Sequence, residues 1–300
     1  YGLEPIFLNL NKKNERYFRI DCEVKKRKVV DDVLISIIMP AFNAEKTIEK
    51  AINSILGQTW RNIELIVVND CSTDNTQRIL DGINDSRLKV IKNIKNVGAY
   101  VSKNIALKVA TGTYITGHDS DDWAHPSRLE NHMTAIKENG FPKASITRMI
   151  RMDKTGFFSH IGKEGAFSVD GVMRIASITC MFESDFLKKN LGGWDSVRFG
   201  ADSEIIARAT KILGKNFKNF EQISMICLDA EGSLTNDPIH GVSKETGISP
   251  TRKEYRDAWM AWHETLDTNN MYLEFPHQKR KFAVPNAAFV STEDINANLE

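Results

Sequence analysis

VLISIIMP, residues 33–40, is an almost unbroken apolar run that ends at a proline. A run of this kind is typical of a strand in a parallel sheet, because such strands are covered on both faces and lack the alternation of a half-exposed strand. Residues 43–57 then carry apolar side chains at helical spacing, between Asn43 as a suitable N-cap and Gly57 as a suitable end. Together the two stretches predict a strand, a turn and a helix.

The same unit recurs along the residues that follow. IELIVVND at 63–70 repeats the buried-strand pattern, and RLKVIKN at 87–93 and TYITGHD at 113–119 predict two more strands. Helices are predicted between them, over 73–83 and 98–112. Alternating strands and helices require a mostly parallel sheet with helices on both faces. The predicted fold class is therefore α/β, with a Rossmann-like central sheet.

Composition excludes several classes of protein. The chain has 300 residues, of which 41% are hydrophobic and 26% charged, a composition typical of a folded globular protein. The chain has 40 Lys and Arg against 39 Asp and Glu. Because its net charge is close to zero, the composition does not favour nucleic acid as a partner. No apolar run reaches the roughly 18 residues of an integral membrane segment. The four cysteines lie far apart without C-x-x-C spacing, which favours free thiols and a cytoplasmic location.

Three zones are expected along the chain. Residues 1–32 are predicted to be an N-terminal arm or the remnant of a preceding module, and residues 33–232 the α/β domain. Residues 233–300 are predicted to be a C-terminal extension that packs on this domain. Because the chain begins at Tyr1 rather than at a methionine, we expect further modules in the full-length protein.

Polar segments follow three of the predicted strands: PAFN, NDCSTDN and HDSDDW. Ligands of open α/β sheets bind outside the carboxyl ends of the strands, so these segments should meet on one rim. The rim has carboxylates but no Gly-rich phosphate loop, which favours a ligand whose phosphates are neutralised by a divalent cation. The missing loop also argues against a nucleotidyltransferase.

The segment HDSDDW carries the candidate metal ligands. Asp119, Asp121 and Asp122 are hard oxygen donors suited to magnesium or manganese, and alternation in an extended segment points the first two the same way. A solvated, Asp-rich surface turn is the alternative. A calcium-binding EF-hand loop is excluded, because Trp123 and Ala124 stand where an oxygen ligand and a glycine are required.

Three segments together resemble the family 2 inverting glycosyltransferases of the GT-A fold. They are 35–76, 96–129 and 192–208, and the resemblance extends over about residues 34–215. It implies a nucleotide diphosphate sugar as donor, commonly a UDP-sugar, and Mn²⁺ or Mg²⁺ bound through an Asp-x-Asp motif. It also implies inverting transfer to a hydroxyl of a carbohydrate or glycoconjugate acceptor, in polysaccharide or glycoconjugate synthesis. The expected location is cytoplasmic, in peripheral contact with the inner membrane face.

The resemblance assigns the residues of the donor site. Pro40, Ala41 and Phe42 match the start of the nucleotide pocket, and Asp70 matches an aspartate that accepts the uracil ring N–H. Asn69 replaces the aspartate that is usual before it.

A second set of donor residues comes from the segment that follows the third predicted strand. Asn96, Gly98 and Lys103 match the stretch that runs beside the nucleotide, with lysine where arginine is commoner. Phosphate pairing through Lys103 would then be a point charge rather than a bidentate fork.

Metal, base and acceptor residues follow from the same comparison of motifs. Asp119 and Asp121 match the ribose and metal carboxylates and Asp122 flanks them, so Asp121 and Asp122 are both candidate metal ligands. Which of these two contacts the ion directly is left open, and His240 is a possible third ligand.

Within GGWD and GADSEI, Trp194 lies where acceptor sugars stack and Asp202 where the catalytic base stands. Ala201 replaces a glutamate that is common there. Glu204 is the alternative acceptor-side carboxylate. Because residues two apart on a helix point in different directions, only one of Asp202 and Glu204 can face the acceptor.

One alternative function keeps the fold without the catalysis: a carbohydrate- or nucleotide-binding module. The joint presence of Asp70, the aspartates of HDSDDW and Asp202 argues against it. Hydrolysis of the donor on addition of manganese would discriminate between the two functions.

Overall fold

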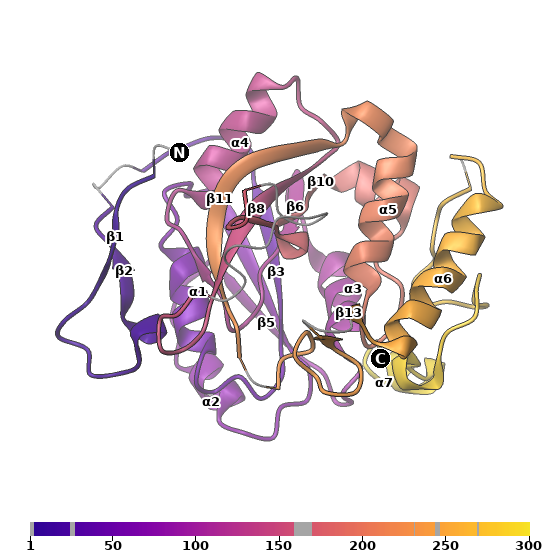
Figure 1. Ribbon diagram of the computed structural model, residues 1–300, viewed down its shortest axis with the longest axis horizontal. Helices are drawn as coiled ribbons and strands as arrows, with labels where there is room; N and C mark the ends of the chain where they lie inside the picture. The colour runs from indigo at the N-terminus through magenta and orange to yellow at the C-terminus, as the bar shows by residue number, and fades with distance from the viewer. Residues whose placement is uncertain (1–2, 25–27, 159–169, 231, 244–246, 269) are drawn as a thin grey trace.

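A central sheet covered by helices forms the body of the protein (Figure 1). The computed structural model describes residues 3–24, 28–158, 170–230, 232–243, 247–268 and 270–300. Within these residues the strand order is β5-β4-β3-β6-β10-β8-β11-β7, and β9 pairs with β8 outside this path. The strands are β3 (Ile35–Ala41), β4 (Ile63–Asn69), β5 (Leu88–Lys92), β6 (Tyr114–Gly117), β7 (Trp123–Ala124), β8 (Ala144–Met152), β9 (Arg174–Ile175), β10 (Met181–Glu183) and β11 (Lys218–Leu228).

The predicted parallel arrangement is confirmed for the first half of the sheet. Strand β3 lies between β4 and β6 and pairs in parallel with both, and β4 pairs in parallel with β5. Beyond β6 the sheet is mixed, because β10 is antiparallel to both of its neighbours while β11 runs parallel to β8. The α/β class is therefore correct, and the departure from parallel pairing begins where the strand-helix alternation of the sequence ends.

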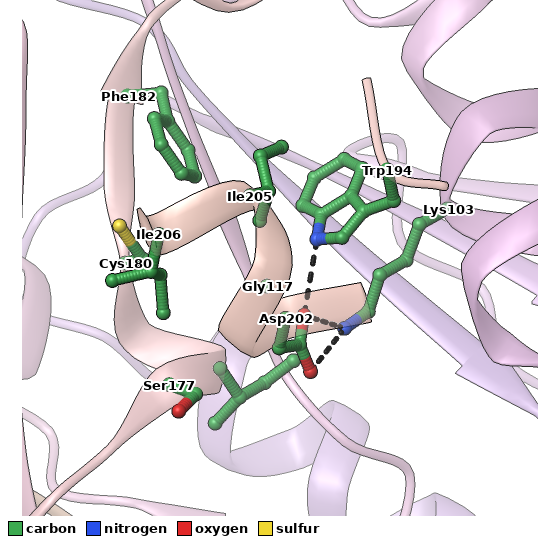
Figure 2. Close-up of a pocket in the computed structure, with 10 residues that line it drawn as sticks. Lys103, Gly117, Ser177, Cys180, Phe182, Trp194, Asp202, Ile205 and Ile206 are labelled. Carbon is green, nitrogen blue, oxygen red and sulfur yellow. Dashed lines mark hydrogen bonds and ion pairs between the residues drawn. The ribbon is translucent and has the colours of Figure 1, made fainter. Parts of the chain in front are cut away.

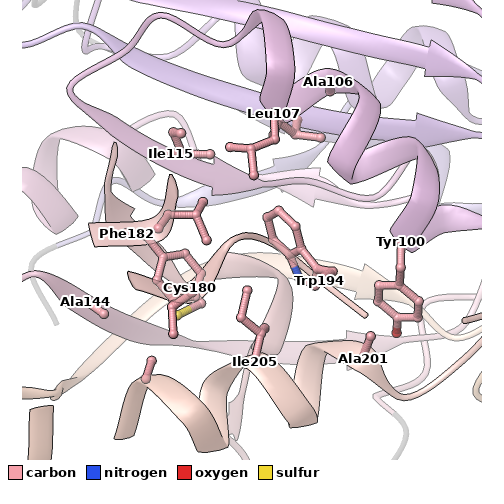
Figure 3. Close-up of a cluster of buried hydrophobic side chains, with 14 of the residues drawn as sticks. Tyr100, Ala106, Leu107, Ile115, Ala144, Cys180, Phe182, Trp194, Ala201 and Ile205 are labelled. Atoms are coloured by element: carbon pink, nitrogen blue, oxygen red, sulfur yellow. The ribbon is translucent and has the colours of Figure 1, made fainter. Parts of the chain in front are cut away.

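Two hydrophobic cores lie on opposite faces of the sheet. Along β3, Ile37 and Met39 belong to the core under α1 and α4, whereas Ile38 belongs to the core under α3, α5 and α6. Figure 3 shows part of the second core, with side chains of α3 and α5 that extend into it. This alternation explains the unbroken apolar run, since both faces of the strand are covered. The helices are α1 (Ile48–Leu56), α2 (Thr76–Asp81), α3 (Ala99–Val109), α4 (Arg128–Glu138), α5 (Ala201–Leu213), α6 (Pro250–Glu264) and α7 (Thr292–Ala297).

Helix α1 begins later than the sequence pattern predicts. Its N-cap position is Thr47 rather than Asn43. Asn43 has a positive φ of 48° and its Oδ1 accepts a hydrogen bond from the backbone N–H of Thr73 at 2.8 Å. The predicted cap is therefore wrong, because this side chain joins the loop after β3 to the loop after β4.

Both flanking segments pack against the sheet domain. Near the N-terminus, β1 (Ile6–Leu8) and β2 (Ile20–Cys22) form an antiparallel hairpin, and Lys50 of α1 donates a hydrogen bond to the Ile20 carbonyl at 2.9 Å. At the other end, Oδ1 of Asn298 accepts from the N–H of Ile94 at 2.7 Å, which ties the last helix to the loop after β5. Among the helices of the described residues, none combines the length and the apolar character that crossing a bilayer requires.

Glu64 is a buried carboxylate that joins four segments of the sheet. It accepts hydrogen bonds from Ser36 of β3 at 2.6 Å, from Lys89 of β5 at 2.6 Å and from the N–H of Thr111 before β6 at 2.6 Å. Burial alone would raise the pKa of Glu64, but the hydrogen bonds from Lys89, Ser36 and Thr111 outweigh it and lower the pKa to about 2. The charged form is therefore the one that the fold stabilises.

We predict that Glu64→Gln lowers the free energy of unfolding at neutral pH, by at most roughly 3 kcal/mol for a pKa lowered from 4.5 to about 2. Because the folded-state pKa is depressed, this contribution is fully present above the unfolded pKa and is lost as pH falls from about 4.5 to about 2. Urea unfolding of both proteins across this pH range measures it. The exposed Glu138→Gln is the matched control, and equal losses in the two variants would contradict the prediction.

Candidate active site

Asp202 lies at the centre of a group of polar side chains from three segments (Figure 2). Lys103 of α3 contacts its two carboxylate oxygens at 2.9 and 3.2 Å. The indole Nε1 of Trp194, from the turn before α5, donates to Oδ1 at 3.0 Å. A cavity of about 10 Å³, enough for about one water molecule, adjoins these three residues. The predicted base therefore has both oxygens engaged by its neighbours.

Lys103 is held in place by more than its ion pair. Its side chain is only 2% exposed, and its ammonium group lies 4.9 Å from the ring centre of Tyr100 and 5.5 Å from that of Trp194. Such cation–π contacts are strongest when desolvated, as here. The resemblance predicted a contact between Lys103 and the nucleotide phosphates. In this structure its partner is Asp202, 99 residues away in sequence.

Asp119 and Asp121 lie in the loop after β6, and both are half-buried. Burial raises the pKa of Asp119, Lys103 opposes this increase, and Asp202 adds to it. Burial and then the neighbouring Asp119 raise the pKa of Asp121 to about 6. The negative charge of Asp202 therefore acts on Asp119, as expected for residues that gather at one end of the sheet.

Arginines supply much of the positive charge that offsets this loop. Arg128 is 1% exposed, and its guanidinium donates to the Gly117 carbonyl at 2.7 Å and to Nδ1 of His118 at 3.0 Å. Burial, and then Arg128, lower the pKa of His118, so this ring is neutral and accepts the hydrogen bond. Arg151 on β8 also lowers the pKa values of the loop aspartates. The sequence analysis missed both arginines.

Asp122 faces a different partner from the other two aspartates. Its Oδ1 accepts a hydrogen bond from the N–H of Leu228 in β11 at 2.9 Å, and the residue is 4% exposed. Burial, then Asp121 and Asp119, raise its pKa well above the usual value. This geometry favours a structural role for Asp122, and it makes Asp119 the better partner of Asp121 in a metal site.

The donor set of the acidic loop fits a divalent cation that also contacts a ligand. Within the described ranges, no group of three His, Cys, Asp or Glu side chains is arranged to hold a metal ion. His240 stacks on Phe199 with ring centres 5.7 Å apart and contacts Thr251 through Nδ1 at 2.9 Å. Magnesium is usually bound by one or two carboxylates together with substrate phosphates. Asp119 and Asp121, whose pKa values are raised by burial and by neighbouring carboxylates, suit that arrangement.

Asp70 holds the start of α3 rather than presenting a free carboxylate. Oδ1 accepts from the side chain of Asn93 at 2.8 Å and from the N–H of Val97 at 3.0 Å, and Oδ2 accepts from the N–H of Gly98 at 2.7 Å. The residue is 2% exposed. Three acceptor positions are thus used by the chain itself, which leaves little capacity for the predicted hydrogen bond from a uracil ring.

The other predicted donor residues lie around this loop. Asn96 accepts a hydrogen bond from Arg198 at 2.6 Å, which connects the loop to the turn before α5. Gly98 has φ 83°, a conformation that favours glycine. Pro40 and Ala41 are buried at the end of β3, whereas Phe42 is 51% exposed. Of the three residues predicted for the nucleotide pocket, only Phe42 presents a large accessible surface.

The structure places the two predicted acceptor residues inside the protein. Glu204 is 0% exposed and forms a buried ion pair with Arg208 at 2.6 Å, with His263 at 3.0 Å on the same oxygen. This geometry does not fit contact with an acceptor, so we correct the assignment to a structural one. Trp194 is 5% exposed and packs edge-on against Phe182, so a stacked sugar would have little of its face to cover.

A contact from the N-terminal arm reaches the acidic loop. The hydroxyl of Tyr17 donates to the backbone carbonyl of Asp121 at 2.7 Å, and Tyr17 is 1% exposed. Its ring belongs to a core cluster with Trp123 and Ile226. The sequence offered a hydrophobic residue at this position but no signal for the partner 104 residues away.

Comparison with known proteins adds to this geometry. The model of the family described as glycosyl transferase family 2 matches residues 36–190, just over half of the 300 residues. The chain belongs to glycosyl transferase family 2. The predicted family is confirmed, and with it the enzyme class at the level of the family.

Several relatives and solved structures resemble this family 2 chain. WfgD from Escherichia coli, named as a UDP-Glc:alpha-D-GlcNAc-diphosphoundecaprenol beta-1,3-glucosyltransferase, is 44% identical over 110 residues, which are 37% of this chain and 44% of WfgD. TuaG from Bacillus subtilis, named as a putative teichuronic acid biosynthesis glycosyltransferase, is 39% identical over 107 residues, 35% of this chain and 42% of TuaG. Each match thus spans less than half of the relative.

The structure of S. aureus TarS in complex with UDP superposes with a TM-score of 0.53 at 24% identity, over 66% of this chain and 61% of TarS. This likeness concerns the fold alone, and it confirms the predicted GT-A type of architecture.

We predict that Tyr17→Phe loosens the acidic loop without unfolding the protein. Loss of one buried hydrogen bond should cost about 1 kcal/mol of stability and free the Asp121 carbonyl. Amide hydrogen exchange of residues 118–124 should then become faster, as measured by mass spectrometry. Tyr272→Phe, at a tyrosine that is 45% exposed, is the control. Unchanged exchange in the Tyr17 variant would show that the arm does not hold the loop.

Proposed function

We propose that this chain is a metal-dependent inverting glycosyltransferase that moves a sugar from a UDP-sugar to a hydroxyl of a carbohydrate or glycoconjugate. The observation that carries the proposal is the convergence of Asp202, Lys103 and the acidic loop at one end of the sheet in a member of family 2. The setting is polysaccharide or glycoconjugate synthesis, on the cytoplasmic side of a membrane.

The donor and acceptor classes are supported by the relatives. WfgD is named for UDP-glucose as donor and for an acceptor that carries a diphosphate, and TarS has been solved with UDP. In this chain Phe42 offers an exposed ring beside the loops after β3 and β4, where the base of a nucleotide would lie. Asp70 shapes the neighbouring loop through the N–H groups of Val97 and Gly98.

Asp119 and Asp121 would hold Mg²⁺ or Mn²⁺ together with the donor diphosphate. When bound there, a divalent cation supplies Lewis-acid stabilisation of the negative charge on the departing diphosphate. The negative charge of the loop is otherwise offset by Arg128, Arg151 and Lys103. Tyr17 and Asp122 keep the backbone of this loop in place through their hydrogen bonds.

Asp202 is the proposed general base. The acceptor oxygen attacks the anomeric carbon while its proton passes to a carboxylate oxygen of Asp202, and the bond to the diphosphate oxygen breaks with its electron pair. A single displacement of this kind inverts the configuration. For this step one oxygen of Asp202 must be released by Lys103 or Trp194. A bound diphosphate would compete for Lys103, which already interacts with Asp119.

The ion pair between Lys103 and Asp202 favours a second candidate function, a nucleotide- or carbohydrate-binding module without catalysis. If Lys103 keeps Asp202 occupied in the presence of donor, the carboxylate takes no proton from an acceptor. The two functions therefore differ in one measurable property, the turnover of bound donor.

We predict that Asp202→Asn separates binding from chemistry. Asparagine keeps the size of the side chain but cannot take a proton, so turnover should fall by about two to four orders of magnitude. UDP affinity, measured by calorimetry with Mn²⁺, should stay within a few fold. Turnover is followed as Mn²⁺-dependent hydrolysis of a panel of UDP-sugars. Near-normal hydrolysis by the variant would remove Asp202 as base, and UDP binding without hydrolysis by the wild type would favour the binding module.

We also predict that Asp121→Asn weakens the increase in UDP affinity that Mn²⁺ brings, because one of two carboxylates at the cation is lost. The apoprotein should remain folded, since the change relieves repulsion from Asp119. Asp122→Asn is the matched comparison: it disturbs the contact with Leu228 and should change thermal stability more than the Mn²⁺ effect. The opposite ranking of the two variants would assign the metal to Asp122.

A further inference from the structure

Two arginines lie on one face of the sheet beside the acidic loop. Strands β8 and β9 are antiparallel with Met149 opposite Arg174. Arg151 is two residues after Met149, so its side chain and that of Arg174 leave the same face of the sheet as diagonal neighbours. In β11, Cys227 is opposite Arg151, and its Sγ lies 3.0 Å from Sδ of Met149. This contact confirms that Met149 and Arg151 have their side chains on the same face of the sheet.

The guanidinium group of Arg174 is poorly compensated, whereas Arg151 has carboxylates near it. Burial, and then the charge of Arg151, lower the pKa of Arg174, so the two groups repel one another. In the part of the chain that the structure describes, the Nε of Arg174 is buried and has no hydrogen-bond partner. The ion pair of Arg151 with Asp229 has a separation of 3.6 Å, longer than a hydrogen bond.

The position of the pair points to the acceptor side of the site. Arg151 is opposite Cys227 in β11, and the N–H of the next residue, Leu228, donates to Asp122, so Arg151 borders the acidic loop. Its charge also lowers the pKa values of the loop aspartates. In the strand order, β8 lies beyond β6 and β10, on the side away from the loops after β3 and β4 (Figure 1). A nucleotide at those loops would not cover the two arginines, which are both only partly buried.

Neutralisation of the acidic loop explains why an arginine stands at position 151, but it does not explain the arginine at position 174. Arg128 and Arg151 already act on the loop aspartates, whereas the pKa values of these aspartates show no comparable influence of Arg174. Placing a second guanidinium next to Arg151 costs electrostatic energy that an anionic ligand would recover. Guanidinium groups donate paired hydrogen bonds in a planar fork that matches phosphate oxygens.

We propose that Arg151 and Arg174 form a binding site for the phosphate or diphosphate group of an anionic glycoconjugate acceptor. This inference rests on the proposed function, since it gives the acceptor of that reaction its charge. The arginine pair holds the phosphate group of the acceptor while its sugar hydroxyl reaches Asp202. An acceptor without a phosphate would bind more weakly, because the pair would keep its mutual repulsion.

Inorganic pyrophosphate is the probe for this site. Calorimetry in EDTA and at low salt leaves the acidic loop without the cation that a donor diphosphate would need, so binding reports on the arginines. We expect Arg174→Gln to weaken pyrophosphate binding about tenfold, the loss of a charge-assisted hydrogen bond, and Arg174→Lys to retain part of the affinity. UDP affinity in Mn²⁺ should change less than twofold in both variants.

Arg256→Gln, which removes the same charge from an exposed position on α6, is the matched control and should bind pyrophosphate like the wild type. Melting temperatures establish that each variant is folded. Absence of pyrophosphate binding by the wild type, or equal weakening in the Arg174 and Arg256 variants, overturns the inference. Failure of the wild type to bind UDP in Mn²⁺ would instead count against the proposed function. The comparison of pyrophosphate binding between the Arg174 and Arg256 variants would still test the arginine site.

Discussion

Repulsion among carboxylates at one end of the sheet is the constraint on which the site depends. Asp119, Asp121 and Asp122 lie in the loop after β6, and Asp202 at the start of α5 adds its charge to that of Asp119. In a partly buried region such charges destabilise the fold unless cations lie close by. Lys103, Arg128 and Arg151 meet this requirement from α3, α4 and β8. The elements that carry these cations are therefore as much a part of the site as the acidic loop.

Local patterns in the sequence were enough to predict the elements of the parallel half of the sheet. The apolar runs of β3 and β4 arise because both faces of these strands are covered, and that requirement is visible in each strand by itself. In the mixed half, β10 has three residues and β9 two, too few to show a period. Asn43 was misassigned as a cap because its partner, Thr73, belongs to another loop.

The candidate site was predicted in its residue types more than in its contacts. Motifs located Asp202 and the acidic loop, but the pairs that define their chemistry join residues far apart in sequence, such as Tyr17 with Asp121. The degree of burial could not be predicted from the sequence either. Glu204 was the alternative to Asp202, yet its partner Arg208 also donates to the carbonyls of Leu191 and Gly193. A carboxylate in such a network is costly to remove and has no surface to offer a substrate.

Lys103 makes Asp202 and the acidic loop interdependent. It pairs with Asp202 and also acts on the charge of Asp119, so a change in one carboxylate alters the field at the other. An exchange of substrate specificity by transplanting segments from a relative would therefore need to carry α3, the loop after β6 and the start of α5 together. In a chimera with a foreign acidic loop and the original α3, Lys103 would still be positioned for the carboxylates of the original loop.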